Sequence, residues 1–483
     1  MKWVATSIIL VTFAVPVSAE ERYQSFDRDP RWQSHQSRLR LLGPRPVKQD
    51  FGFSKTQHAG GRSAGELGGY IQPAAEPAYY AKQVPKKTFA DKLTASGVVN
   101  CTGRQFHVVL GFFNNKTLNE WRTPNTISLR LYGRGDVFYG YVEYATSRWR
   151  AGGDNPRPFP FLTDPETGRR KPKGFARNRS HRWTISYDPF ANGGQGVIRA
   201  SIGGATAVCN LDPGHKQDGA TFNRFGLMTV MKHWDEGGEV WLDDLSVGDT
   251  MESFDRDPNW DGFQNRQQYR SNSVRPRFDF GYSKTRYAGG AAQGELGGAV
   301  FRGDCRFPDK MAYYGDQVGD LSLMKPIRAS GKIRLRRGVS DSTTLLGFFH
   351  SKRSMQVNPS QASGIPNEFL GVAIEGPSRH GFFFYPQYRF AENLQKVDQG
   401  SERPVIMPDG RSHDWSLRYE PGKGASGGRI TVSLGKQQTV LPMDAKHRSQ
   451  TTRFDRFGII TTWVDGNGQQ IYFDDLSYTS EQK

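Results

Sequence analysis

Side chains able to act as acids, bases or charge-neutralising groups occur in matching pairs along the chain. The pairs are Tyr80 and Tyr314, His181 and His413, Arg224 and Arg456, and Glu66 and Glu295. Side chains of these types can transfer protons or neutralise developing negative charge when they are held together. The structural alternative is that each His caps a turn and each Arg pairs with an aspartate. No Gly-x-Ser-x-Gly string supports a serine nucleophile.

Both glutamates of these pairs stand in the same glycine-rich string. Glu66 and Glu295 each occur within Gly-Glu-Leu-Gly-Gly. Glycine lets a ligand approach the backbone closely, so these carboxylates could reach an open groove. The favoured alternative is a turn or bulge in which the glutamate is hydrogen-bonded.

Aspartates recur at both ends of two long segments and suggest a calcium site. The first set is Asp27, Asp29, Asp243 and Asp244, and the second is Asp255, Asp257, Asp474 and Asp475. Their oxygens are the hard ligands that calcium prefers, if the first and last strands are neighbours. The alternative is a salt-bridge network with Arg28 and Arg224. No His or Cys spacing supports zinc.

Aromatic residues are concentrated in two short segments, 137–144 and 382–388. One face of each expected strand must leave the core, so some rings could form a sugar-stacking platform. The candidates are Tyr139, Tyr141, Trp149, Tyr385 and Tyr388, with Trp121 as a further loop aromatic. Loops that cover both faces are the alternative.

Positive charge is locally concentrated in segment 157–182. It holds eight Lys or Arg residues against two acidic ones, and the expected ligand-binding members are Arg169, Arg170, Lys171 and Lys173. The whole chain carries +17. This composition favours an acidic polysaccharide or cell-surface glycan as partner, and we expect no binding to nucleic acid. A solvated insertion is the alternative.

The chain is an internal duplication. Matching strings recur in order at nearly constant offset, for example at 24–32 and 252–260, 65–69 and 294–298, 222–226 and 454–458, and 243–246 and 474–477. The repeat predicts one domain at 20–250 and a second at 251–483, with almost no linker. We expect Trp183 and Trp415 in equivalent core positions.

Each copy is expected to consist of short strands. Trp183, Ile185 and Tyr187 alternate with polar residues, and segment 415–419 shows the same period of two. The chain has 55 Gly and 27 Pro, which favours many turns, and it lacks sustained helical periodicity. The pattern predicts an all-β protein made of two tandem antiparallel β-sandwich (jelly-roll) domains.

The last 70 or so residues of each copy carry a specific order of features. They run His-x-Trp-x-x-x-Tyr, a turn, a glycine hairpin, Phe-x-Arg-Phe-Gly and a strand with Asp-Asp-Leu. This order resembles the concanavalin A-like, laminin G-like jelly-roll superfamily, which includes lectins, carbohydrate-binding modules, glycanases and polysaccharide lyases. The resemblance implies a glycan context and leaves catalysis open. The Glu-x-Asp-x-x-Glu string of jelly-roll glycanases is absent.

The first 19 residues have the pattern of a secretory signal peptide. One Lys precedes a short apolar run that ends in Val17-Ser18-Ala19, and no later stretch is long enough to span a bilayer. We therefore expect a periplasmic or secreted protein. Three Cys exclude a disulfide-stapled miniprotein, and a Cys101–Cys209 bond is left open.

These observations predict an exported protein that binds acidic glycan or a surface partner without catalysis. The alternatives are a polysaccharide lyase or glycoside hydrolase on the same scaffold, and a structural envelope protein.

Overall fold

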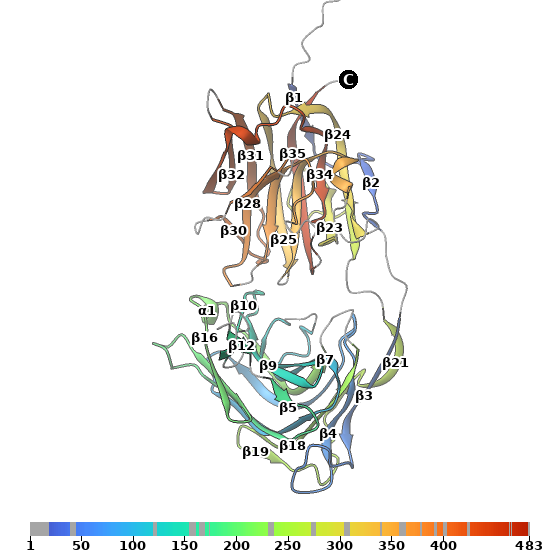
Figure 1. The fold of residues 1–483 in the computed structure, drawn as a ribbon, viewed down its shortest axis with the longest axis vertical. Coiled ribbons are helices and arrows are strands. Elements are labelled where there is room, and N and C mark those ends of the chain that lie inside the picture. Colours follow the sequence, from blue (N-terminus) through green and yellow to red (C-terminus); the bar gives the residue numbers. More distant parts are fainter. Residues whose placement is uncertain are drawn as a thin grey trace, which may run out of the picture.

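Strands dominate the computed structural model, which forms two stacked sandwiches (Figure 1). It describes residues 19–38, 45–118, 123–153, 161–163, 170–172, 174–229, 236–271, 277–303, 310–338, 341–356, 364–376, 379–390, 394–398, 403–422, 426–462, 464 and 466–481. The named strand pairs are antiparallel, which confirms the predicted all-β class of antiparallel sandwiches. No helix in the described ranges is long and apolar enough to cross a membrane.

Domain 1 contains a nine-stranded and an eight-stranded sheet. The first runs β16 (Ala205–Asn210), β15 (Val197–Ile202), β14 (His181–Asp188), β6 (Leu93–Cys101), β18 (Gly238–Val247), β4 (Glu66–Ile71), β3 (Arg45–Ser54) and β21 (Arg266–Ser271), with β19 (Thr250–Glu252) beside β18. The second runs β10 (Ala151–Gly152), β9 (Val137–Ala145), β8 (Thr126–Arg134), β7 (Gln105–Phe113), β17 (Thr221–Thr229), β5 (Tyr79–Thr88) and β20 (Asp261–Phe263), with β13 (Phe175–Ala176) beside β9. A hairpin of β11 (Phe161–Thr163) and β12 (Arg170–Pro172) and the short helix α1 (His215–Asp218) complete it.

Domain 2 has two eight-stranded sheets. One runs β22 (Phe278–Ser283), β23 (Glu295–Phe301), β35 (Gly468–Glu481), β25 (Ile327–Gly338), β31 (His413–Pro421), β32 (Gly428–Leu434) and β33 (Gln437–Met443), with β1 (Ala19–Gln24) beside β35. The other runs β2 (Gln33–His35), β24 (Tyr313–Ser322), β34 (Arg453–Ile460), β26 (Thr343–Phe349), β27 (Phe369–Glu375), β28 (Phe382–Arg389) and β29 (Gln395–Val397), with β30 (Val405–Ile406) beside β28. Two 3-10 turns lie at Arg353–Met355 and Ala445–His447.

The alternation expected from the sequence produces the core of each sandwich. Trp183, Ile185 and Tyr187 are buried on β14. Trp183 is paired with Gly97 on β6, and Trp415 is paired with Gly331 on β25. The two tryptophans therefore occupy corresponding places, each opposite a glycine of the neighbouring strand.

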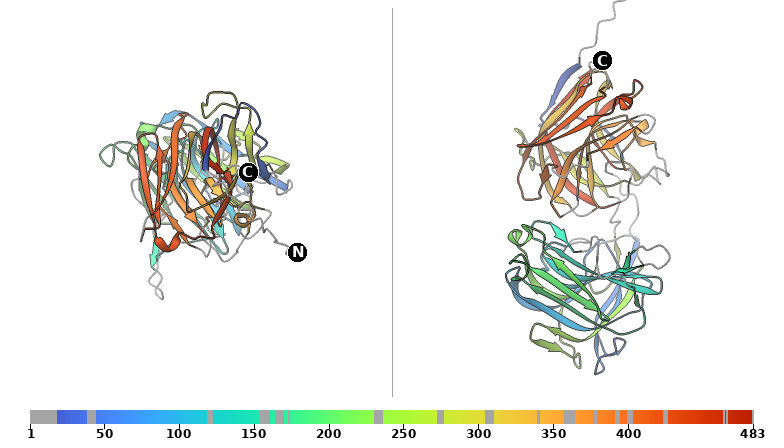
Figure 2. Two further views of the ribbon diagram at one scale, coloured as in Figure 1. Left: turned by 90° about the horizontal axis from the view of Figure 1, so that it is seen from above. Right: turned by 60° about the vertical axis from the view of Figure 1, so that its left-hand side comes forward.

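The first segments of the two copies are exchanged between the domains. Residues 19–38, here called arm 1, pair with β35 and β24 of domain 2. Residues 250–271, here called arm 2, pair with β18, β5 and β3 of domain 1. The sequence repeat begins its second copy at Met251, but the sheets do not divide there, because arm 2 completes domain 1 and arm 1 completes domain 2. The blue N-terminal strand beside the red C-terminal strands shows this (Figure 2).

Buried aromatic residues fasten each arm. Phe26 and Trp32 of arm 1 belong to the hydrophobic core of domain 2. Phe254 of arm 2 belongs to the core of domain 1, with Trp260 packed against it. Phe26 and Phe254 both have left-handed backbone conformations, with φ 55° and 57°. The two arms thus use the same local conformation on opposite domains.

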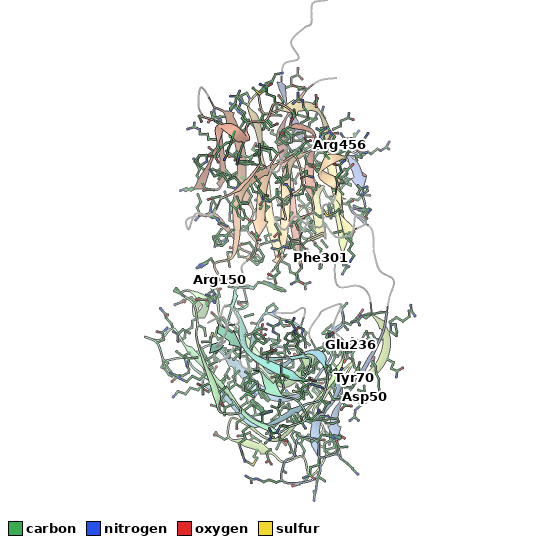
Figure 3. The ribbon with its side chains drawn as sticks, in the orientation of Figure 1. Asp50, Tyr70, Arg150, Glu236, Phe301 and Arg456 are labelled. Carbon is green, nitrogen blue, oxygen red and sulfur yellow. The ribbon has the colours of Figure 1, made fainter. Side chains whose placement is uncertain are left out.

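Polar and ring contacts join the facing ends of the domains, where Arg150 and Phe301 are labelled in Figure 3. His215 donates a hydrogen bond from Nε2 to the Arg379 carbonyl at 2.7 Å, and Arg379 pairs with Asp212 at 3.3 Å. The Arg337 guanidinium lies 5.2 Å from the Trp149 ring centroid. Burial lowers the pKa of Arg337 to about 10.

The sheet order separates the two described cysteines. Cys101 is buried in β6, whereas Cys209 lies on β16, and β14 and β15 stand between them. Cys101 and Cys209 are therefore not bonded to each other. Cys305 lies outside the described residues.

Candidate functional site

The eight-stranded sheet β10–β20 of domain 1 and the sheet β2–β29 of domain 2 each turn one face away from the core. We call these the outward faces of domain 1 and domain 2. On strands β7, β8 and β9, the outward face of domain 1 has a cross-strand row formed by His107, Tyr132 and Tyr139. A second row places Val109, Arg130 and Tyr141 side by side.

The outward face of domain 1 combines rings with a charged pair. His107 stacks on Tyr132 with ring centroids 4.1 Å apart, and Tyr132 lies 6.3 Å from Tyr139. The Arg130 guanidinium lies 4.6 Å from the Tyr141 centroid. Tyr132, Tyr139 and Tyr141 are all half-buried. Half-exposed rings next to a cation suit a sugar ring that carries an acidic group.

A nearly buried ion pair orients this arginine. Arg130 Nε lies 2.8 Å from Glu143 Oε1, and both side chains are less than a tenth exposed. Glu143 lies on β9 two residues from Tyr141, and therefore on the same face. The pair neutralises its own charge, so Arg130 contributes a fixed planar surface and hydrogen-bond donors more than net charge.

The outward face of domain 2 contains a cavity of about 240 Å³. Arg302, Glu375, Tyr385 and Gln387 are among its lining residues. Arg302 is bound to Glu375 at 2.8 Å and donates to Thr343 Oγ1 at 2.9 Å. The Tyr385 hydroxyl donates to Glu375, and the Arg403 guanidinium covers the Tyr385 ring at 4.6 Å.

Burial raises the pKa of Tyr385, and the neighbouring Glu375 carboxylate raises it further. The phenol is therefore protonated at neutral pH. It donates a hydrogen bond to Glu375, and its raised pKa makes it a poor proton donor and leaves it without the phenolate form that a base requires.

The residues predicted to form an aromatic platform do not all lie on the outward faces. Tyr139, Tyr141 and Tyr385 lie on the outward faces, as described above. Tyr388 does not, because it lies an odd number of residues from Tyr385 and its side chain enters the core, where its hydroxyl donates to His447 Nδ1 at 2.7 Å. Trp149 is engaged by Arg337 at the domain contact instead of forming an open platform. Trp121 lies outside the described residues.

The glutamates of the glycine-rich strings are buried and brace a loop. Glu66 accepts hydrogen bonds from the Thr56 hydroxyl at 2.6 Å and from the backbone N–H groups of His58 and Ala59, both at 2.7 Å. Glu295 makes the corresponding bonds in domain 2. Neither carboxylate reaches an open groove, which agrees with the turn-bracing alternative.

The recurring tyrosines and arginines contact the arms. Tyr80 and Tyr314 are buried, and their hydroxyls donate to Asp257 at 3.3 Å and Asp29 at 3.4 Å. Burial raises the pKa of each tyrosine to about 12. Arg224 donates to Asp261 of arm 2 at 2.8 Å. Arg456 donates to Gln33 of arm 1 at 2.8 Å, at the edge labelled in Figure 3.

The histidines have separate surroundings. His181 donates to the Ala176 carbonyl at 2.8 Å and packs against Phe138 and Phe175. His413 lies at the start of β31, paired with Ile333. The His413 Nε2 atom is buried without a hydrogen-bond partner among the described residues. In each copy the His lies on one sheet, and the Tyr and Arg lie on the other, where they contact an arm, so the three do not form one constellation.

The aspartates meet in combinations that cross the sequence repeat. Asp27 and Asp29 belong to arm 1, which pairs with domain 2. They therefore lie away from Asp243 and Asp244 of domain 1. The carboxylates near Asp243 are Asp244, Glu66 and, from arm 2, Asp255. A bulge interrupts the β18–β6 register after Asp243, and Asp244 and Asp475 have φ 47° and 48°.

Burial dominates the chemistry of the two inner aspartates. It raises the pKa of Asp243 to about 6 and that of Asp474 to about 7. Asp474 accepts from the Gly290 N–H at 3.1 Å and the Asp475 N–H at 2.8 Å. In the part of the chain that the structure describes, no three His, Cys, Asp or Glu side chains are grouped to hold a metal. Calcium binding stays a prediction.

Of the 26 residues of the basic segment 157–182, 11 lie outside the described residues, at 157–160, 164–169 and 173. Arg169 and Lys173 belong to that part, and of Arg170 and Lys171 only the backbone is described, in the β11–β12 hairpin.

Sequence reasoning missed several residues of the outward faces. They are His107, Arg130, Tyr132, Glu143, Arg302, Glu375, Gln387 and Arg403. The strict alternation of segment 126–134 was the available signal, because it places Arg130 and Tyr132 on the face opposite Leu129 and Leu131.

Similar solved structures are β-sandwich proteins, with low identity throughout. Mouse laminin α1 domains LG4-5 share 10% identity and a TM-score of 0.23 over 86% of this chain and 90% of that chain. The cellulose-induced protein Cip1 shares 14% identity and a TM-score of 0.26 over 41% of this chain and 84% of that chain. An alginate lyase from Pseudomonas aeruginosa shares 13% identity and a TM-score of 0.24 over 41% of this chain and 85% of that chain.

No family model and no curated protein matches the chain significantly. The strand pairing itself therefore carries the classification. The chain consists of two β-sandwich domains built from antiparallel sheets, as the sequence predicted.

Proposed function

We propose that the chain is an exported, non-catalytic glycan-binding protein that favours acidic polysaccharide. The observation that carries the proposal is the outward face of domain 1, where Arg130 stacks on Tyr141 beside the row of His107, Tyr132 and Tyr139. Half-exposed rings offer flat apolar surfaces for sugar faces, and Arg130, held by Glu143, fixes the Tyr141 ring beside them.

The preference for an acidic partner is supported by charge. The chain carries +17 and concentrates eight basic residues in segment 157–182. Positive potential attracts polyanions over distances of a Debye length, about 8 Å at physiological salt. The pattern of residues 1–19 supports export.

A polysaccharide lyase is the second candidate function, and a specific observation favours it. Arg302, Tyr385 and Gln387 line one cavity in domain 2, and these are residue types that could hold a uronate. The raised pKa of Tyr385 opposes the role of base. The separate placement of His413, Tyr314 and Arg456 gives no other constellation for this reaction.

Affinity electrophoresis of the full chain in gels containing polygalacturonate tests the proposal. We expect retardation by the acidic polymer and little retardation by neutral dextran. The double substitution Tyr139→Ala and Tyr141→Ala should lower the affinity about tenfold, since ring contacts contribute about 0.5–1.5 kcal/mol each. Phe190→Ala is the control, because Phe190 is exposed on a turn outside this face. Equal retardation of all variants would show that the outward face does not bind the polymer.

A further inference from the structure

A cavity of about 910 Å³ lies where arm 1 crosses domain 2. Arm 1 supplies Trp32, Ser34 and Ser37 to its wall, and β22 and β24 supply Tyr282 and Tyr314. The volume falls within the range of ligand-binding pockets, about 300–1,000 Å³. None of its lining residues lines the 240 Å³ cavity of the outward face, so the two cavities are distinct.

Three basic and two acidic side chains border the cavity. Arg31 and Arg38 come from arm 1 and Lys284 from domain 2, against Asp29 and Asp279. All five side chains are exposed. Arg38 is held by a hydrogen bond to the Tyr282 carbonyl, and Asp29 accepts from the Tyr314 hydroxyl at 3.4 Å. The local excess of positive charge favours a ligand with a carboxylate.

Rings and hydroxyls complete the wall. Trp32 and Tyr314 lie with ring centroids 5.8 Å apart and an interplanar angle of 32°, and Tyr472 lines the same cavity. The hydroxyls of Ser34 and Ser37 lie 2.8 Å apart and share a hydrogen bond. Trp32, Tyr314 and Tyr472 are buried and form the floor of the cavity. The half-buried Tyr282 ring and the exposed Ser34 hydroxyl suit a sugar, which has both apolar faces and hydroxyl edges.

Domain 1 has the same arrangement of arm and sheet but different residues at key positions. Asn265 of arm 2 stands where arm 1 has Ser37, and Asn259 stands where arm 1 has Arg31. The Asn265 side chain donates to the Phe51 carbonyl at 2.6 Å and lies 3.2 Å from where a Cβ atom on Gly52 would be. At the corresponding Gly281, the nearest atom to such a Cβ belongs to the Tyr314 ring. The smaller Ser37 thus leaves open the space that Asn265 occupies in domain 1.

We propose that the cavity between arm 1 and domain 2 binds a short acidic oligosaccharide, such as a segment of polyuronate. Arg31 and Lys284 would receive a carboxylate, the half-buried Tyr282 ring would contact a sugar face, and the buried Trp32 and Tyr314 would form the floor of the site. The ligand class rests on the proposed function, whereas the site itself depends only on the exchange of arm 1. The exchange makes this site a property of the full chain, because its two walls come from opposite ends of the sequence.

Isothermal titration of the full chain with tetragalacturonate tests the site. All measurements use a background with Tyr139→Ala, Tyr141→Ala and Tyr385→Ala, so that the outward faces contribute little. We expect one bound tetrasaccharide per chain in this background. Ser37→Asn should lower the affinity at least tenfold, because it introduces the residue of domain 1 into the cavity. Asn265→Ser, the reciprocal change, should leave the affinity within twofold.

A second variant keeps the test valid if Ser37→Asn unfolds the protein. Arg31→Asn changes an exposed residue with φ 52° to one that tolerates this conformation. It should weaken tetragalacturonate at least fivefold and leave neutral maltotetraose unaffected. Absence of binding in the background, or binding unchanged by both Ser37→Asn and Arg31→Asn, would overturn the inference.

The failures of the two proposals are distinguishable. The wild-type chain could be retained by the polymer while the triple variant of Tyr139, Tyr141 and Tyr385 fails to bind the tetrasaccharide. That result would refute the cavity site and still support binding at the outward faces. Tetrasaccharide binding lost with Ser37→Asn, together with polymer retention unaffected by the outward-face substitutions, would refute the outward faces and leave the cavity.

Discussion

The carbonyl oxygen of Phe26 lies 1.9 Å from the position that a Cβ atom would occupy on Gly294. The carbonyl of Phe254 lies at the same distance from the Cβ position of Gly65. Each glycine opens a Gly-Glu-Leu-Gly-Gly string, so the string admits the backbone of an arm and its Glu braces the adjacent loop. A motif that suggested chemistry in the sequence therefore serves arm docking.

The first prediction concerns this close approach. Gly294→Ala should displace arm 1 and lower the free energy of unfolding by more than about 2 kcal/mol, because backbone atoms must move and φ is 128°. Thermal melting and limited proteolysis of arm 1 measure the effect. Gly435→Ala is the matched control, with φ 55° and no atom within 4 Å. It should cost only about 1 kcal/mol and leave arm 1 protected.

The second prediction tests the exchange of the arms. Phe26→Ala should destabilise domain 2, and Phe254→Ala should destabilise domain 1, each by about 3–5 kcal/mol, since both rings are buried in the core of the other copy's domain. Hydrogen exchange followed by mass spectrometry locates the loosened sheets. Loosening of domain 1 by Phe26→Ala would contradict the exchange.

The exchange shows where sequence reasoning ends. Alternation at Trp183, Ile185 and Tyr187 sufficed to predict strands and a sandwich, because period two is a local property. The repeat gives each arm two similar docking surfaces, and local sequence does not say which one it takes. The alternation of residues along β28 also did not show whether Tyr385 or Tyr388 would face outward. Both faces of this strand carry aromatic rings, so neither face could be recognised as the core side from the sequence.

The third prediction concerns pH. Asp474 and Asp243 have pKa values raised to about 7 and about 6, so the folded protein binds their protons more tightly than the unfolded chain does. Their contribution to stability is complete below about pH 4 and is lost as the pH rises to about 7.

Asp474→Asn removes the titrating group from this range. The melting temperature of the variant should fall less between pH 5 and pH 8 than that of the wild type. Asp414→Asn, at a site whose side chain is 83% exposed, is the control. Identical pH dependence of wild type and Asp474→Asn would show that Asp474 does not titrate there.

The fourth prediction concerns the basic segment. Replacing four of its cations should lower the salt concentration that elutes the protein from heparin; these are Arg169, Arg170, Lys171 and Lys173. Exposed contacts contribute about 1 kcal/mol or less each, so several must act together. The control replaces four dispersed, exposed cations of domain 1, which are Lys55, Lys86, Arg104 and Lys116. Equal elution of both variants would show that net charge, not clustering, governs retention.

Binding without cleavage is the central claim of this account. The most direct measurement incubates the full chain with polygalacturonate and follows retention in the gel together with absorbance at 235 nm, where products of eliminative cleavage absorb. We predict retention that depends on Tyr139 and Tyr141, with no rise in absorbance over hours. A rise that Tyr385→Phe abolishes would contradict the account and identify a polysaccharide lyase.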